Sequence, residues 1–116
     1  MGWYEFPYGG SGGKGDTWEG TIDVELSDED YARVEASIKG GCSDMGDDPE
    51  IADIYEAIYE KIIDVTLESE RDIDMIDEYR EDYDCDEDTT DREVIEIFLD
   101  EQGCSINYPY EFQKKY

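Results

Sequence analysis

Histidine is missing from this chain, and basic residues are few, because 9 Lys and Arg stand against 35 Asp and Glu. Without an imidazole, His-based zinc sites, His acid–base catalysis and Cys–His nucleophile pairs are excluded or badly weakened. The three cysteines, Cys42, Cys85 and Cys104, include no CxxC pair, and their odd number does not fit a disulfide framework. We therefore expect a protein that is not an enzyme, binds no cofactor and resides in a reducing cytoplasm.

Long apolar runs are lacking too, since no stretch comes near the length of about 18 residues that a membrane helix needs. Neither a membrane span nor a secretory signal is expected. The net charge of −26 would suit a disordered chain, but the 38% hydrophobic residues fall into periodic segments, which favours folding. A length of 116 residues supports one core, so we expect residues 1–116 to form a single acidic α+β domain.

Strand patterns lie near both ends of the chain. Residues 17–26 and 104–112 alternate apolar and polar side chains, the pattern of a half-buried antiparallel strand. Residues 3–8 are aromatic and extended in character, and Pro7 restricts them to an edge strand or a strand end. A flexible Gly-rich loop is expected at 9–16. The economical fold is a small antiparallel sheet of two or three strands, built from the N- and C-terminal segments and packed on one face by three or four helices.

Helix signals occupy the middle of the chain. Ser27 is placed to cap a short helix that ends at Gly40 and Gly41. Asp48 caps the next helix, and Pro49 lies in its first turn, where the missing N–H is not needed. This second helix carries apolar residues at three- and four-residue intervals, the spacing that buries one helical face.

The apolar pattern of the second helix continues past its expected end. The helix is expected to run to about Val65, and residues 66–83 continue it with a shifted apolar stripe. Periodicity does not distinguish one bent helix from two. We expect a break near Thr66.

A possible calcium loop precedes the last predicted helix, which runs to Gln102 and stops at Gly103. Its oxygen-bearing residues follow the EF-hand spacing of positions 1, 3, 5, 7, 9 and 12: Asp82, Asp84, Asp86, Asp88, Thr90 and Glu93. Glu87, however, stands where the sharp turn of that loop requires glycine. We therefore expect a solvated acidic loop followed by a Thr90–Glu93 capping box, and only weak, nonspecific divalent binding.

Tyrosine is abundant, and four tyrosines lie among the acids of the central helices. Tyr55 and Tyr79 follow the apolar stripe and are expected in the core, with their hydroxyls reaching water. Tyr59 and Tyr83 drift off the stripe. The alternative for these two is a role as aromatic anchors of an interface with a carboxylate rim, because Tyr is enriched at interface centres.

Carboxylates form a row on the second helix and a block after it. Asp53, Glu56, Glu60 and Asp64 follow one another at three- and four-residue steps, so neighbours lie roughly 5 to 6 Å apart along one line. Residues 68–91 hold 13 Asp or Glu and two Arg. The predicted partner-binding residues are the acids and two tyrosines of this region: Asp53, Glu56, Tyr59, Glu60, Asp64, Glu68, Glu70, Asp72, Asp74, Asp77, Glu78, Glu81, Asp82, Tyr83, Asp84, Asp86, Glu87 and Asp88.

Charge density gives the functional interpretation. Duplex DNA carries about two charges per 3.4 Å step, so a charge of −26 corresponds to roughly 13 base pairs, or about 44 Å of duplex. In size and charge the chain resembles the DNA-mimic inhibitors, such as anti-restriction and anti-CRISPR proteins of phages and mobile elements. The resemblance implies that it binds a basic nucleic-acid-binding protein, a nuclease or a CRISPR or restriction effector, and blocks its DNA or RNA site. It implies neither direct nucleic-acid binding nor a membrane partner.

Three alternatives remain open from the sequence. One is an immunity protein that neutralises a basic nuclease toxin. Another is a calcium-binding module that uses residues 82–93. The third is an acidic protein adapted to a salt-rich cell, in which the carboxylates serve solubility.

Overall fold

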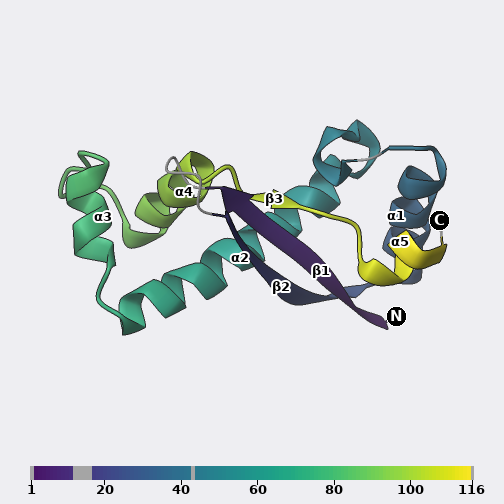
Figure 1. The fold of residues 1–116 in the computed structure, drawn as a ribbon, viewed down its shortest axis with the longest axis horizontal. Coiled ribbons are helices and arrows are strands. Elements are labelled where there is room, and N and C mark those ends of the chain that lie inside the picture. Colours follow the sequence, from purple (N-terminus) through teal and green to yellow (C-terminus); the bar gives the residue numbers. More distant parts are fainter. Residues whose placement is uncertain (1, 12–16, 43, 116) are drawn as a thin grey trace.

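The computed structural model describes residues 2–11, 17–42 and 44–115 and confirms the α+β fold (Figure 1). Its described part contains a three-stranded antiparallel sheet in the order β2-β1-β3 and five α-helices. The body is elongated, with extents of 44 × 29 × 23 Å. In chain order the elements are β1 (Gly2–Ser11), β2 (Thr17–Leu26), α1 (Asp28–Lys39), η1 (Met45–Asp47), η2 (Pro49–Ile51), α2 (Ala52–Asp72), α3 (Ile76–Asp82), α4 (Asp91–Glu101), β3 (Ser105–Ile106) and α5 (Tyr110–Lys115).

The β1–β2 hairpin is longer than the sequence indicated. Its register runs from Gly2 opposite Leu26 to Ser11 opposite Thr17, so Gly9 and Gly10 are strand residues and not part of a flexible loop. Glycine is needed there because the chain is crowded. A Cβ on Gly9 would lie 2.5 Å from the Trp18 carbonyl oxygen, and one on Gly10 would lie 2.4 Å from that of Gln102. Residues 12–16 of the expected loop lie outside the described residues.

Pro7 lies in the central strand, which corrects the expectation of an edge strand. Its carbonyl oxygen accepts a 2.8 Å hydrogen bond from the Asn107 N–H, so the side of Pro7 that lacks an N–H faces the C-terminal segment. The β1–β3 ladder pairs only Tyr8 with Ile106 and Gly9 with Ser105. Pro7 therefore lies next to a ladder of only two residue pairs. The N–H that Pro7 lacks breaks no hydrogen bond of a longer ladder.

The C-terminal strand predicted for residues 104–112 is wrong over most of its length. Only Ser105–Ile106 is a strand, and α5 begins at Tyr110. Pro109 explains the change, because it has no N–H for a ladder, while its carbonyl accepts from the N–H groups of Phe112 and Gln113 and so starts a helix. Ile106 and Tyr108 are nonetheless buried as the alternation predicted, and Phe112 is buried from the helix.

The sheet buries one face and leaves the other open. Phe6, Val24 and Leu26 enter the core, whereas Trp3 on the opposite face is 66% exposed. The core-forming helices lie on the buried face, as expected, whereas α3 lies beyond the end of the sheet and contacts α4 (Figure 1). The acids that lie exposed on the open face are Glu5, Glu19, Asp23 and Glu25.

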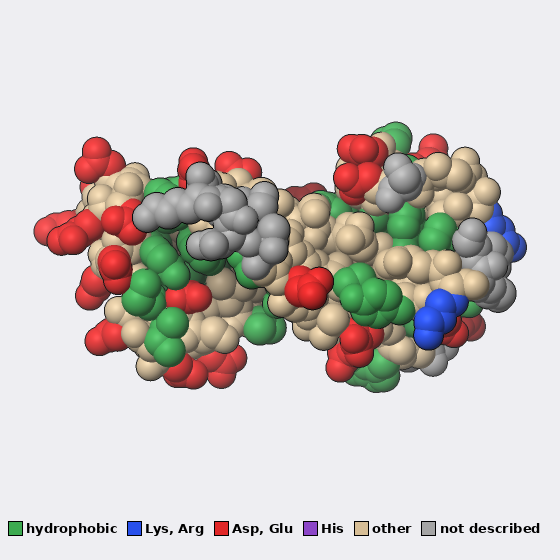
Figure 2. All heavy atoms as spheres, viewed as in Figure 1, with side chains coloured by type: hydrophobic (Ala, Val, Ile, Leu, Met, Phe, Trp, Pro, Cys, Tyr) green, Lys and Arg blue, Asp and Glu red, His purple; other side chains and the backbone are tan. Residues whose placement is uncertain are grey.

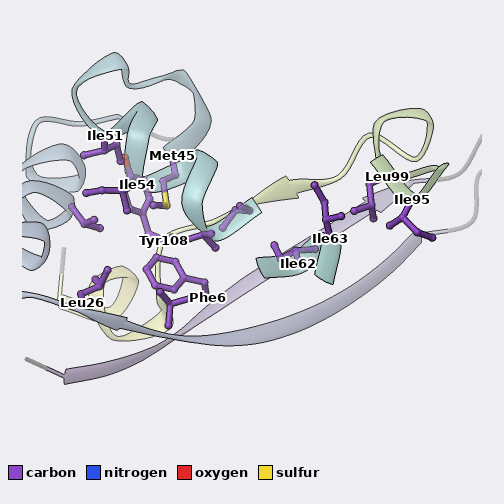
Figure 3. Close-up of a cluster of buried hydrophobic side chains, with 14 of the residues drawn as sticks. Phe6, Leu26, Met45, Ile51, Ile54, Ile62, Ile63, Ile95, Leu99 and Tyr108 are labelled. Atoms are coloured by element: carbon purple, nitrogen blue, oxygen red, sulfur yellow. The ribbon is translucent and has the colours of Figure 1, made fainter. Parts of the chain in front are cut away.

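One hydrophobic core runs along the molecule, with α2 as its spine (Figure 3). Near its start, Ile54 lies with Met45 and Tyr108 beside the sheet residues Phe6 and Leu26. Further along, Ile63 lies toward Leu99 and Ile95 of α4, and Ile62 lies beside it in the same core. The periodic isoleucines of α2 thus contact the sheet with one part of the helix and α4 with the other.

Helix α2 does not break near Thr66, which corrects the sequence prediction; it continues to Asp72. Two helices are separated instead at Ile73–Met75. Asp74 adopts φ 60°, the Met75 N–H donates to the Glu70 carbonyl, and the Asp74 N–H donates to that of Arg71. These are the two bonds of a Schellman motif, here with Asp in the left-handed position that glycine usually occupies.

Exchanging this left-handed residue should change stability in opposite directions for two uncharged replacements. Asp74→Gly is expected to raise the free energy of unfolding by up to about 1 kcal/mol, because glycine adopts positive φ without a Cβ clash. Asp74→Ala, which removes the same charge, is expected to lower it by about 1 kcal/mol. Urea denaturation at fixed salt measures both. A stabilising alanine would show that relief of charge repulsion, and not φ, dominates at this site.

Candidate partner-binding surface

The predicted carboxylate row on α2 is present, but its two ends are already neutralised. Asp53 receives both guanidinium nitrogens of Arg33 at 2.6 and 3.0 Å, and this pairing lowers the pKa of the carboxyl. Asp64 pairs with Arg92 of α4. Between them, Glu56 and Glu60 have no ion-pair partner within the part of the chain that the structure describes. Of the four carboxylates in the row, only those of Glu56 and Glu60 are therefore unpaired within the described residues.

A dense acidic surface forms at the end of the molecule that carries α3. In Figure 2 the acidic side chains crowd this end, and the basic side chains visible on the same face lie at the opposite end. We call this surface the acidic end. Its exposed acids come from the last turns of α2, the α2–α3 junction, α3 and the following loop: Glu68, Asp72, Asp74, Asp77, Glu78, Glu81, Asp82, Asp84, Asp86, Glu87 and Asp88.

The two arginines of the acidic end do not offset its exposed acids. Arg71 and Arg80 converge on Asp91 at the start of α4, at 3.2 and 2.7 Å. The hydrogen bond from Arg80, supported by Arg71, lowers the pKa of the Asp91 carboxyl. Both cations are thus directed to an aspartate at the base of the surface, and the outer carboxylates remain uncompensated.

A shallow groove of about 560 Å³ separates α2 from α4. We call it the α2–α4 groove. Its apolar lining comes from Tyr55, Tyr59, Ile63 and Ile97. The carboxylates lie on both sides, Glu56 and Glu60 from α2 and Glu96 and Asp100 from α4.

The tyrosines of the groove are stacked and half-buried. The ring centroids of Tyr55 and Tyr59 lie 6.3 Å apart with an interplanar angle of 23°. Burial, followed by the nearby Cys104 thiol and Asp100, raises the pKa of Tyr59 to about 12. The hydroxyl therefore stays protonated at neutral pH and is available as a hydrogen-bond donor. Tyr59 thus lies next to carboxylates and a partly open apolar surface. These are the surroundings that the interface hypothesis predicts for an aromatic anchor.

Sequence reasoning missed one side of the groove. It identified Glu56, Tyr59 and Glu60 on α2 but did not select Glu96 or Asp100 on α4. The signal was present, because Glu96 and Asp100 have the same four-residue spacing as Glu56 and Glu60. What the sequence did not supply was the packing of α4 beside α2.

The remaining predicted residues have other surroundings. Glu70 accepts a 3.0 Å hydrogen bond from the Tyr79 hydroxyl and is partly buried, so it is not a free carboxylate. Tyr79 stacks on Phe98 at 4.5 Å and packs against the core, as expected, but its hydroxyl donates to Glu70 where water was predicted as its partner. Tyr55, expected in the core, also packs against it while lining the groove. Tyr83 lies at the end of α3, 6.3 Å from the ring of Tyr79 and away from the groove.

The loop predicted as a calcium candidate is organised by its own hydrogen bonds. One oxygen of Asp86 accepts from the N–H groups of Asp88 and Thr89 and from the Thr89 hydroxyl at 3.0–3.1 Å. Arg80 donates to the Asp86 carbonyl, which puts a cation against the loop. The positive φ falls on Asp84 and not on Glu87. Within residues 2–11, 17–42 and 44–115, no three metal-ligating side chains gather as a metal site would require.

The Thr90 N-cap predicted after this loop is confirmed, but the Glu93 carboxylate meets the Thr90 hydroxyl and not the backbone N–H that a capping box uses. The Thr90 hydroxyl oxygen accepts from the Glu93 N–H, and the Thr90 hydroxyl donates to the Glu93 carboxylate. Thr90 and Glu93, the last two candidate calcium ligands, are therefore engaged in starting α4.

Calcium binding is expected to be weak and nonspecific. To coordinate a cation, Asp86 and Glu93 would have to leave the hydrogen bonds that hold the loop and the helix start. Calorimetric titration with calcium at physiological salt is expected to show no stoichiometric micromolar binding. Such binding, if found and then lost in the Asp82→Ala, Glu93→Gln variant, would contradict this prediction and make metal the main function.

None of the helices in the described residues is both long and apolar enough to cross a membrane. Cys42, Cys85 and Cys104 are free thiols, and burial raises the pKa of the Cys104 thiol to about 11, which keeps it unreactive. Comparison of the chain with protein-family models, curated proteins and solved structures finds no match.

Proposed function

We propose that this protein binds a basic nucleic-acid-binding protein and blocks its DNA or RNA site by presenting carboxylates in place of phosphates. The observation that carries the proposal is which charged side chains form ion pairs within the protein and which do not. The arginines Arg71, Arg80 and Arg92 pair with the protein's own acids, whereas the carboxylates of the acidic end and the groove point to solvent. A non-enzymatic, cytoplasmic inhibitor of a nuclease, CRISPR or restriction effector fits this surface.

The dimensions support the same proposal. The long axis of 44 Å matches the length of about 13 base pairs, the amount of duplex that carries the same charge as this chain. The body therefore has a nucleic-acid-sized length, along which the acidic end and the α2–α4 groove carry the uncompensated carboxylates. Because exposed charges are screened over about 8 to 10 Å at physiological salt, attraction to a basic groove must weaken as salt rises.

Competition and salt dependence are expected together. When this protein is immobilised, it should capture a basic protein from lysate of the cells that produce it. A duplex of about 13 base pairs should then displace the captured basic protein. The affinity should fall by more than about tenfold between roughly 50 and 200 mM salt. Fluorescence anisotropy with labelled duplex measures the competition. Simultaneous binding of duplex and this protein, with an affinity indifferent to salt, would contradict the proposal.

A further inference from the structure

We infer that the α2–α4 groove takes an amphipathic helix of the partner, with an aliphatic stripe flanked on both sides by Arg or Lys. This inference rests on the proposed function and gives its partner a recognition element that phosphate does not possess. The groove combines an apolar, aromatic lining with a carboxylate row on each side. Nucleic acid has no aliphatic stripe, so imitation of phosphate alone gives no reason for this lining.

The spacing of the carboxylates favours a helix. Glu56 and Glu60 are four residues apart on α2, and Glu96 and Asp100 are four residues apart on α4, so each pair spans about 6 Å along its helix. Basic residues four apart on a partner helix repeat at the same interval. A helix also projects basic side chains to both sides of one apolar stripe, whereas each face of a strand is a single row wide.

The exposed apolar atoms in the groove support an aliphatic occupant. Ile97 is 37% exposed although it lies one helical turn from the buried Val94. Tyr59 and Tyr55 present half-buried rings beside it, and Ile63 closes the floor at 3% exposure. Tyr is enriched at the energetic centres of interfaces, and Arg or Lys stems cover apolar surface while their heads reach carboxylates.

Charge disfavours a second copy of this chain as the occupant. Each copy carries −26, and the groove has carboxylates on both sides, so a second acidic surface would meet like charge. A basic helix instead replaces repulsion across the groove with attraction. Its cations can also lie over the Tyr55 and Tyr59 rings, an arrangement worth about 0.5–1 kcal/mol at exposed sites.

Two synthetic helical peptides of equal charge test the inference. The first carries a leucine stripe flanked by Arg at four-residue spacing, and the second has serine in place of each leucine. In an NMR titration of the intact protein, the leucine peptide should shift the resonances of Tyr59 and Ile97 and bind at least about tenfold more tightly than the serine peptide. The difference should persist at about 300 mM salt, where charge attraction is largely screened.

Two variants give the matched control. Ile97→Asp should weaken binding of the leucine peptide by about tenfold and leave the serine peptide unaffected within about twofold. Val65→Asp adds the same charge at another aliphatic residue, 48% exposed on α2 but outside both the groove and the acidic end, and should change neither. Circular dichroism checks that both variants remain folded.

The outcomes separate this inference from the proposed function. If both peptides bind equally and shift only the acidic end, the groove inference fails, while duplex competition for the natural partner still supports mimicry. If the leucine peptide binds in the groove but the partner binds together with its nucleic acid, mimicry fails and the groove remains a site for basic helices. A dimer in sedimentation that Ile97→Asp dissociates would overturn the inference in favour of a second copy.

Discussion

Ile62→Ala is expected to lower the free energy of unfolding by about 2–5 kcal/mol, a large fraction of the total stability of a domain this size. Ile62 is fully buried in α2, next to Ile63 and in the same core as Ile95 and Leu99 of α4 (Figure 3). The substitution removes three side-chain carbons and leaves a cavity at the place where the two parts of the core meet. Urea unfolding followed by circular dichroism, at fixed salt, measures the loss.

Ile73→Ala is the matched control for this substitution. It makes the same chemical change on the residue that follows α2, but Ile73 is 63% exposed, so its effect should stay within about 0.5 kcal/mol. Equal effects at the two sites would contradict the assignment of the buried face of α2. A change in the slope of the unfolding curve would instead indicate that α4 separates from α2 before the rest unfolds.

The helices were predictable where burial and capping use common signals. The isoleucines of α2 recur at helical spacing, Ser27 and Thr90 accept at the helix starts as expected, and Gly41 and Gly103 adopt positive φ just beyond the ends of α1 and α4. Each of these features depends on residues near in sequence. Local pattern therefore sufficed for them.

The end of α2 was missed because aspartate takes the place of glycine, whereas the end of α3 at Asp82 agrees with the predicted helical residues 66–83. Asp74 and Asp84 adopt φ values of 60° and 56°, and the following N–H groups of Met75 and Cys85 close Schellman motifs on Glu70 and Arg80. In a segment this acidic, an aspartate carries no distinctive signal for a helix end. The shift of the apolar stripe near Thr66 reflects a change in what α2 packs against and not an interruption of the helix.

The groove needed tertiary information. Residues four apart on α2 identify a row, but only the packing of α4 beside it shows that Glu96 and Asp100 complete the opposite side. Likewise, the interaction of Asp53 with Arg33 and of Asp64 with Arg92 joins residues 20 and 28 positions apart. The sequence predicted the negative surface, whereas the structure distinguishes carboxylates that hold the fold from those free to bind.

Neutralising part of the acidic end is expected to slow association with the basic partner by about tenfold. The variant combines Glu78→Gln, Glu81→Gln, Glu87→Gln and Asp88→Asn, all at exposed carboxylates of α3 and its following loop. Steering by a local negative field raises the association rate, while short-range contacts mainly set dissociation. Stopped-flow kinetics with the captured partner should therefore show a slower association and little change in dissociation.

The open face of the sheet supplies a control of identical chemistry. Glu5→Gln, Glu19→Gln, Glu25→Gln and Asp23→Asn also replace three glutamates and one aspartate, so both variants change the net charge from −26 to −22 by adding 4. If placement matters, the control should slow association by less than about twofold, because its charges lie away from the acidic end and are screened within about 10 Å. The two rates should converge as salt rises. Equal slowing by both variants would mean that total charge alone attracts the partner, and it would contradict a phosphate-like surface located at the acidic end.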